Sequence, residues 1–303
     1  MSGPAIDLVA HGAEAGGTLA GTALLVGPAA AVAAAYEAGV RRLLPTGPPS
    51  WRWRRWSFHL GLVVLVTVLL PVVEPVVEES FPAHMAQHIA LLLVAGPLLA
   101  AGQPGLPLLL ALPHPWRRRV AAVRSSRSAR RVRAAVTVPA VVVAVHAAVV
   151  AAWHLPSVYA AALSSTAVHV TEHACFLAVG WWLWAAVSTS SRQQLDGRTV
   201  LYVVASGLPM NLLGAVLVFA PEPLYPEQTG TGTGALAEQQ LAGLLMWVPA
   251  GMAYLLLCTV LVLVWLRRME RDAPGGVPLP PPTLDALPVP ARSGRPIDAE
   301  VRR

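Results

Sequence analysis

The chain has 303 residues, of which 55% are hydrophobic and only 13% are charged, and its mean hydropathy is +0.57. These values exclude an ordinary soluble globular protein and favour a membrane protein. The sequence contains no lysine, so its formal net charge of +6 comes from arginines, which we expect to report membrane topology rather than nucleic-acid binding.

Seven apolar segments are long enough to cross a bilayer as helices. They cover residues 18–38, 56–73, 83–112, 134–153, 166–187, 199–220 and 238–266. The third contains Pro97, Pro104 and Pro107, so we expect it to be broken, with its membrane part ending near Ala101. The sequence therefore predicts an all-α, polytopic bundle of seven transmembrane helices.

The two ends of the chain differ from this membrane domain, which we place at residues 18–271. Residues 1–17 have no basic stretch before the first apolar segment, which is not typical of a cleavable signal peptide. We expect them to form an external arm. Residues 272–303 are rich in proline and poor in large apolar side chains, so a disordered tail is predicted.

Arginines occupy every second connection between the predicted spans. They are Arg41, Arg42, Arg52, Arg54, Arg55, eight arginines between residues 117 and 133, Arg192, Arg198, Arg267, Arg268 and Arg271. Cytoplasmic loops carry such an excess, which predicts an external N-terminus and a cytoplasmic C-terminus. The segment 116–133 is also compatible with acidic lipid or nucleic acid, but its place in a cytoplasmic loop explains its charge, so we expect no nucleic-acid partner.

Five histidines are predicted to lie at one depth, near the outer face. His84 and His88 are four residues apart at the head of the third span, and His169 and His173 repeat this spacing at the head of the fifth. His154 follows the outer end of the fourth span. Residues four apart share a helix face. Ionisable residues within spans are costly and usually functional.

Imidazole suits copper, zinc, iron and nickel, and a helical pair four residues apart brings two imidazoles onto one ion. The sequence therefore predicts a metal site formed by the five histidines. A hydrogen-bonded interfacial histidine remains the alternative at each position. Six further side chains have auxiliary roles in this hypothesis: Gln87 and Glu172 as partners that orient ligand rings, Glu238 and Gln239 as polar groups at the same depth, and Met85 and Met246 as thioether ligands or packing residues.

Four motifs occur in order along the chain. They are His84-Met-Ala-Gln-His88 with a later Gly96-Pro-Leu-Leu, Trp153-His-Leu-Pro-x-x-Tyr159, His169-x-x-Glu-His173, and Glu238-Gln-Gln-Leu-Ala-Gly-Leu-Leu-Met-Trp-Val-Pro249. Together they resemble the CtaG family of caa-type cytochrome c oxidase assembly factors, over spans two to seven. The family usually has aspartate where this chain has Glu238.

The resemblance implies a multi-pass protein of a bacterial plasma membrane that is needed for an active haem-copper oxidase. It implies copper as the ion and oxidase subunits or a copper donor protein as partners, besides membrane lipid. We therefore expect an assembly factor rather than an enzyme.

Other classes of seven-span protein compete with this interpretation. A retinal protein is excluded, because its Schiff base needs a lysine. A zinc-dependent membrane hydrolase remains possible, with Glu172 as the base that activates water, although no clear Ser/Asp partner set is found in the outer layer. A membrane protein with bis-histidine haem ligation also remains open.

Overall fold

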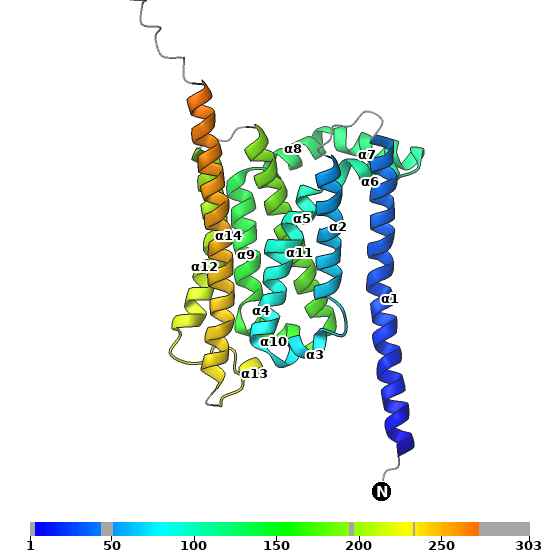
Figure 1. Cartoon of the computed structure of the whole chain (residues 1–303), viewed down its shortest axis with the longest axis vertical. Helices are drawn as coiled ribbons and strands as arrows, with labels where there is room; N and C mark the ends of the chain where they lie inside the picture. Colours follow the sequence, from blue (N-terminus) through cyan, green and yellow to red (C-terminus); the bar gives the residue numbers. More distant parts are fainter. Residues whose placement is uncertain (1–3, 44–50, 194–196, 233, 273–303) are drawn as a thin grey trace, which may run out of the picture.

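The computed structural model describes residues 4–43, 51–193, 197–232 and 234–272, and the regular structure in these ranges is helical (Figure 1). The predicted all-α class is confirmed. The proline-rich tail, apart from Asp272, lies outside the described residues. The N-terminal helix begins at Pro4, so the backbone of residues 4–17 continues the first span as helix.

Long helices run side by side between the two ends of the molecule (Figure 1). They are α1 (Pro4–Leu43), α2 (Trp51–Val68), α4 (Phe81–Ile89) continued by α5 (Gly96–Ala101), α9 (Pro139–Trp153), α11 (Thr166–Gln193), α12 (Gly197–Phe219) and α14 (Ala235–Asp272). Short helices connect them. At the lower end in Figure 1 these are α3 (Glu74–Glu79), α10 (Pro156–Ser164) and α13 (Pro226–Thr229), and at the upper end α6 (Gly105–Ala111), α7 (His114–Ser125) and α8 (Arg127–Val136).

Five helical segments within the described residues are long and apolar enough to cross a membrane. They are Thr18–Leu43, Phe81–Ala101, Thr166–Ser188, Thr199–Phe219 and Ala235–Arg271. A sixth candidate joins α8 to α9 across a bend of 69°. The helix α2 is not among them, and three of its first five residues are arginines. The count of seven spans and the orientation of the termini stay predictions.

The third segment is broken as predicted, and the helical segment in it that is long and apolar enough to cross a membrane ends at Ala101. A π-helix, η1 (Ala90–Ala95), lies between α4 and α5, and the Gly96 N–H donates to the Leu91 carbonyl five residues back. This wider turn precedes Pro97, which has no N–H and whose ring crowds the carbonyl four residues before it. The indole N–H of Trp184 instead donates to the Leu92 carbonyl over 2.9 Å, which ties α11 to η1.

Two glycines let this segment cross α11 closely. A Cβ added to Gly96 would lie 3.0 Å from the Gly180 carbonyl carbon, and one added to Gly180 would lie 3.1 Å from the Leu92 Cα. Neither helix could approach so far with a larger residue at these positions. The crossing lies two turns beyond His88 and His173, so it holds both histidine-bearing helix ends against each other.

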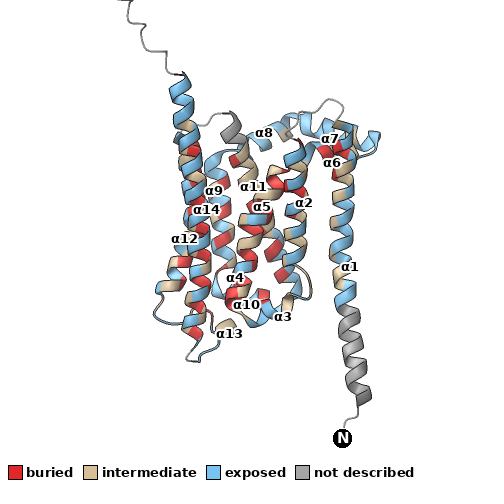
Figure 2. Cartoon of the chain, in the orientation of Figure 1, coloured by how far each residue is buried: buried red, intermediate tan, exposed pale blue. Residues whose placement is uncertain are grey.

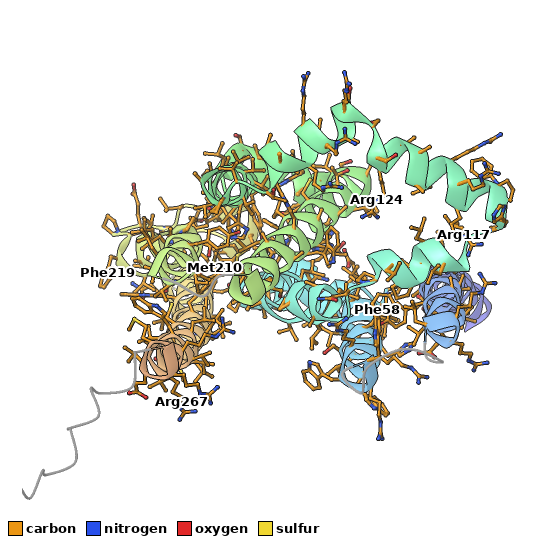
Figure 3. All side chains as sticks on the ribbon, turned by 90° about the horizontal axis from the view of Figure 1, so that it is seen from above. Phe58, Arg117, Arg124, Met210, Phe219 and Arg267 are labelled. Atoms are coloured by element: carbon orange, nitrogen blue, oxygen red, sulfur yellow. The ribbon has the colours of Figure 1, made fainter. Side chains whose placement is uncertain are left out.

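Buried residues concentrate in the middle helices, whereas residues 18–43 of α1 are largely exposed (Figure 2). The main apolar cluster includes Phe81, Met85, Phe176 and Met246. At the upper end of the molecule in Figure 1, α7 and α8 lie along the edge of the bundle. Arg117 and Arg124 of α7 are labelled in the view from above (Figure 3). Seven of the eight arginines in these two helices are exposed, as solvated loop charges should be.

Candidate metal centre

The first histidine pair is placed by a well-anchored helix start. Ser80 caps α4 by accepting a hydrogen bond from the Ala83 N–H over 3.4 Å. The free N–H of Phe81 donates to Oε1 of Glu238 on α14 over 3.0 Å. The following turns place the side chains of His84 and His88 in the buried interior.

Two other elements supply the remaining predicted histidines. His169 and His173 lie in the first turns of α11, one turn apart, and are buried. His154 is the C-cap of α9, where the chain turns towards α10, and it is buried as well.

The structure brings these five side chains together, and we call His84, His88, His154, His169 and His173 the histidine group. Ring centroids lie 5.1 Å apart for His84 and His169, 5.6 Å for His88 and His173, and 5.7 Å for His88 and His154. Three segments far apart in sequence thus converge at one depth, as the helical spacing predicts.

Four side chains of this region can offer one ligand atom each to a single ion. Donor atoms of His84, His169, Glu172 and His173 all lie within 4.8 Å of one another. Two donors that bind one tetrahedral ion at about 2.0–2.1 Å are themselves about 3.4 Å apart. Small side-chain shifts would therefore complete coordination. The carboxylate of Glu172 lies among the imidazoles, as a potential ligand, rather than behind one of them.

Unsatisfied polar atoms mark the same place. The Nε2 atoms of all five members of the histidine group and both carboxylate oxygens of Glu172 are buried and make no hydrogen bond to the residues that the structure describes. An unpaired buried polar group costs about 1–3 kcal/mol. Seven such atoms in one cluster indicate a candidate ligand site, and one metal ion could accept lone pairs from several of them.

Hydrogen bonds at the other ring nitrogen orient three of these imidazoles. Nδ1 lies 2.7 Å from the Val150 carbonyl in His154 and 2.8 Å from Glu74 Oε1 in His169. A carbonyl oxygen only accepts, so His154 must carry its proton on Nδ1, and a neutral ring then presents a lone pair at Nε2. Metal-binding histidines have this arrangement, in which a carbonyl or carboxylate holds the ring.

Tyr159 does the same for His84. Its hydroxyl donates to Oε1 of Gln228 over 2.7 Å and lies 3.3 Å from Nδ1 of His84. Because its proton is committed to Gln228, the tyrosine oxygen accepts from Nδ1–H of His84 and leaves Nε2 free. Gln228 is held in turn by the Glu78 carbonyl, to which its Nε2 donates over 2.5 Å.

A second tyrosine supports the turn at His154. The hydroxyl of Tyr225 donates to the His154 carbonyl over 2.5 Å. Burial raises the pKa of Tyr225 to about 12 and also raises the pKa of Tyr159, so both hydroxyls keep their protons. Both tyrosines line a pocket of about 260 Å³ with Pro156, Leu224 and Pro226. Tyr159 therefore touches both this pocket and the histidine group.

Glu74, Tyr159 and Gln228 are contacts that the sequence did not assign to the site. The hydrogen bond from His169 lowers the pKa of the Glu74 carboxyl, which keeps it an acceptor. The local signal for Glu74 is its place in the acidic connection that follows the second apolar segment. Tyr159 stands in one of the four recognised motifs, but no local signal indicates Gln228.

The remaining predicted auxiliary residues have structural contacts. Gln87 donates to the Val68 carbonyl over 2.6 Å, and Glu238 holds the start of α4. Gln239 is buried and accepts from the Leu224 N–H over 2.5 Å. Met85 and Met246 lie in the main apolar cluster.

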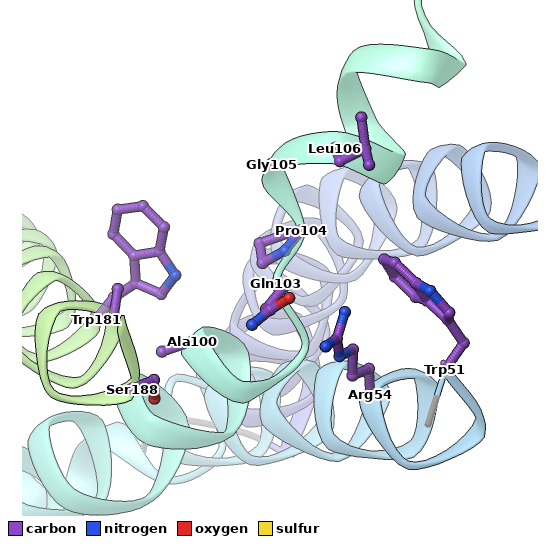
Figure 4. Close-up of a pocket in the computed structure, with 10 residues that line it drawn as sticks. Trp51, Arg54, Ala100, Gln103, Pro104, Gly105, Leu106, Trp181 and Ser188 are labelled. Atoms are coloured by element: carbon purple, nitrogen blue, oxygen red, sulfur yellow. The ribbon is translucent and has the colours of Figure 1, made fainter. Parts of the chain in front are cut away.

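Other polar sites are separate from this centre. His59 lies 2.7 Å from Glu37, which also binds Arg55. A pocket of about 330 Å³ between α2, α5, α6 and α11 is lined by residues that include Trp51, Arg54 and Trp181 (Figure 4). Its lining contains no histidine or carboxylate, so it offers no comparable set of metal ligands.

Comparison with curated proteins and with solved structures gives no significant match. Residues 34–268 match the family model described as cytochrome c oxidase caa3 assembly factor, a range that covers both histidine-bearing helices and the turn at His154. The chain therefore belongs to the family of cytochrome c oxidase caa3 assembly factors.

Proposed function

We propose that this assembly factor binds copper at the histidine group and passes it to an oxidase subunit, without catalysing a reaction of its own. The observation that supports copper binding most directly is the set of buried Nε2 atoms without hydrogen-bond partners, three of which belong to rings held at Nδ1. Such a set is costly as a purely structural cluster, but it is suited to a metal ion.

The donor atoms are nitrogen and oxygen. Cys175 and Cys258 are free thiols outside the group, and the two methionines lie in the apolar cluster. Imidazole with carboxylate suits Cu(II) or zinc better than a soft-ligand Cu(I) site. The family assignment favours copper between these two, because the resemblance implies a haem-copper oxidase as the client.

The two rival functions fit this geometry less well. A hydrolase needs Glu172 free to act on water, whereas its oxygens lie at 3.6 Å from Nε2 of His84 and His88, where they compete as ligands. A bis-histidine haem needs a flat slot between two imidazoles. The rings of the histidine group instead pack on one another, at 4.2 Å between the His169 and His173 centroids.

The same proposal includes the membrane arrangement. We infer seven spans, with α2 and α9 added to the five apolar segments, an external N-terminus, and residence in a bacterial plasma membrane. The histidine group then lies near the outer face, where an external copper donor and the receiving oxidase subunit can reach it. Lipid covers the exposed apolar side chains of α1.

The test is copper content and oxidase assembly in matched variants. We expect His84→Ala with His88→Ala to lose most bound copper in the purified protein, and to lose active oxidase in membranes at equal protein level. His146→Ala and His59→Ala are the controls, because these histidines lie outside the group. Copper content that is indifferent to the double variant, or equally sensitive to a control, contradicts the proposal.

A further inference from the structure

The carboxylate of Glu172 faces two different histidines with its two oxygens. Oε2 lies 3.6 Å from Nε2 of His84, and Oε1 lies 3.6 Å from Nε2 of His88. Both distances are too long for a hydrogen bond. They are close to the separation of about 3.4 Å between two donors on one tetrahedral ion. Each carboxylate oxygen and the Nε2 atom that it faces are therefore about as far apart as two ligands of the same ion.

The ligand atoms of the histidines also fall into two sets. His169 and His173 belong with His84 in the set of donor atoms that lie within 4.8 Å of one another, and His88 and His154 are not in that set. His88 and His154 are neighbours, with ring centroids 5.7 Å apart. The ring of His88 also lies 4.5 Å from His84 and 5.6 Å from His173, so His88 stands next to both sets. The ring of Phe176 packs on both of them, at 4.4 Å and 5.7 Å.

His88 and His154 also have donor atoms without hydrogen-bond partners. Nε2 of His154 is buried and unpaired within the described residues, and His88 has both ring nitrogens buried and unpaired. A single ion bound by His84, His169, His173 and Glu172 would leave these atoms of His88 and His154 unsatisfied. The cost of about 1–3 kcal/mol for each such group would then remain.

We propose that the centre holds two copper ions bridged by Glu172. One ion is bound by His84, His169, His173 and Oε2, and the other by His88, His154 and Oε1. We call these two sets of ligands the half-sites. Ions in two-metal sites lie about 3.5–4 Å apart, a separation that a bridging carboxylate spans. The carboxylates of Glu172 and Glu74 supply negative charge to offset the ions in a buried place. This inference rests on the proposed copper function and adds the number of ions and their division.

The experiment measures copper per chain by elemental analysis, after the purified full-length protein is loaded with Cu(II) and desalted. We expect about two ions per chain in the wild type, and about one in each of the double variants His88→Ala/His154→Ala and His169→Ala/His173→Ala. His146→Ala is the control, because this buried histidine of α9 lies outside both half-sites, and it should keep the wild-type content.

A spin count by electron paramagnetic resonance tests the two-ion inference on the wild-type protein alone. Two Cu(II) ions bridged by one carboxylate couple magnetically, so the electron paramagnetic resonance signal should account for well under the copper content. One copper ion per wild-type chain, with a full spin count, would overturn the two-ion inference but keep the copper function. No copper in the wild type would reject the proposed function itself. Complete copper loss in either folded double variant would overturn the division into half-sites.

Discussion

Nδ1 of His169 on α11 lies 2.8 Å from Oε1 of Glu74 on α3, a contact between residues far apart in sequence. The carboxylate fixes the proton on Nδ1 and turns Nε2 towards Glu172 and the other imidazoles. Partners of this kind hold metal ligands in orientation and raise their basicity. Glu74 is therefore a positioning residue for the centre.

Replacing Glu74 with alanine should weaken copper binding by roughly 10–100-fold, as is usual when the partner of a ligating histidine is lost. The measurement is competition with a chelator of known affinity on the purified protein. Glu78→Gln is the matched control, because Glu78 is exposed on the same short helix and contributes its backbone carbonyl rather than its carboxylate. Equal losses in the two variants would show that the charge of α3, and not the contact with His169, matters.

Gly180→Val should push α11 away from η1, because its Cβ would lie 3.1 Å from the Leu92 Cα. Overpacking of this kind costs about 2 kcal/mol. The variant should therefore unfold at a lower temperature and bind less copper, which thermal denaturation in detergent and metal analysis will measure. Gly27→Val is the control, since a Cβ on this exposed glycine of α1 meets no atom within 4 Å. A wild-type denaturation profile for Gly180→Val would disprove the role of this crossing.

Glu238→Ala removes the acceptor for the Phe81 N–H at the start of α4. A hydrogen bond to a charged group contributes about 2 kcal/mol, so we expect reduced stability and fraying of the first turn before His84. Hydrogen exchange at residues 81–85 is the direct measurement. Glu270→Ala, at the other end of α14, should leave this exchange unchanged. If Glu238→Ala exchanges like the wild type, the anchor is unimportant.

The topology prediction is tested by reporter fusions. Fusions after Glu79 and Glu227 should report an external location, because their connections are acidic, and fusions after Arg124 and at the C-terminus should report a cytoplasmic one. An external signal from the 117–133 region would contradict the assignment of depth to the histidine group.

Local sequence patterns carried much of the fold. Apolar length identified the five helical segments that are long and apolar enough to cross a membrane, and the prolines at 97, 104 and 107 indicated the break in the third segment. The π-helix was not predicted, because it depends on how the chain relaxes around Pro97 and on the Trp184 side chain that binds the released Leu92 carbonyl. Whether α2 crosses the membrane is ambiguous for a physical reason, since its first turns mix tryptophan with arginine.

For the site, helical spacing identified the histidine pairs, and the end of an apolar segment indicated His154. The role of Glu74 could not be predicted from the sequence, because it arises from the contact of α3 with the start of α11. The position of Glu172 follows from the angle at which α4 and α11 meet. Spacing places it beside His173 but does not say which helix it faces.

The candidate ligands and their supports come from α3, α4, the end of α9, α10, α11, α13 and α14. A ribosome-bound chain that has delivered α4 but not α11 lacks His169, Glu172 and His173. Such a chain cannot form the centre. In the proposed function, copper binding must therefore follow insertion of most of the protein, so a chain that holds copper is one whose histidine-bearing helices have already packed together.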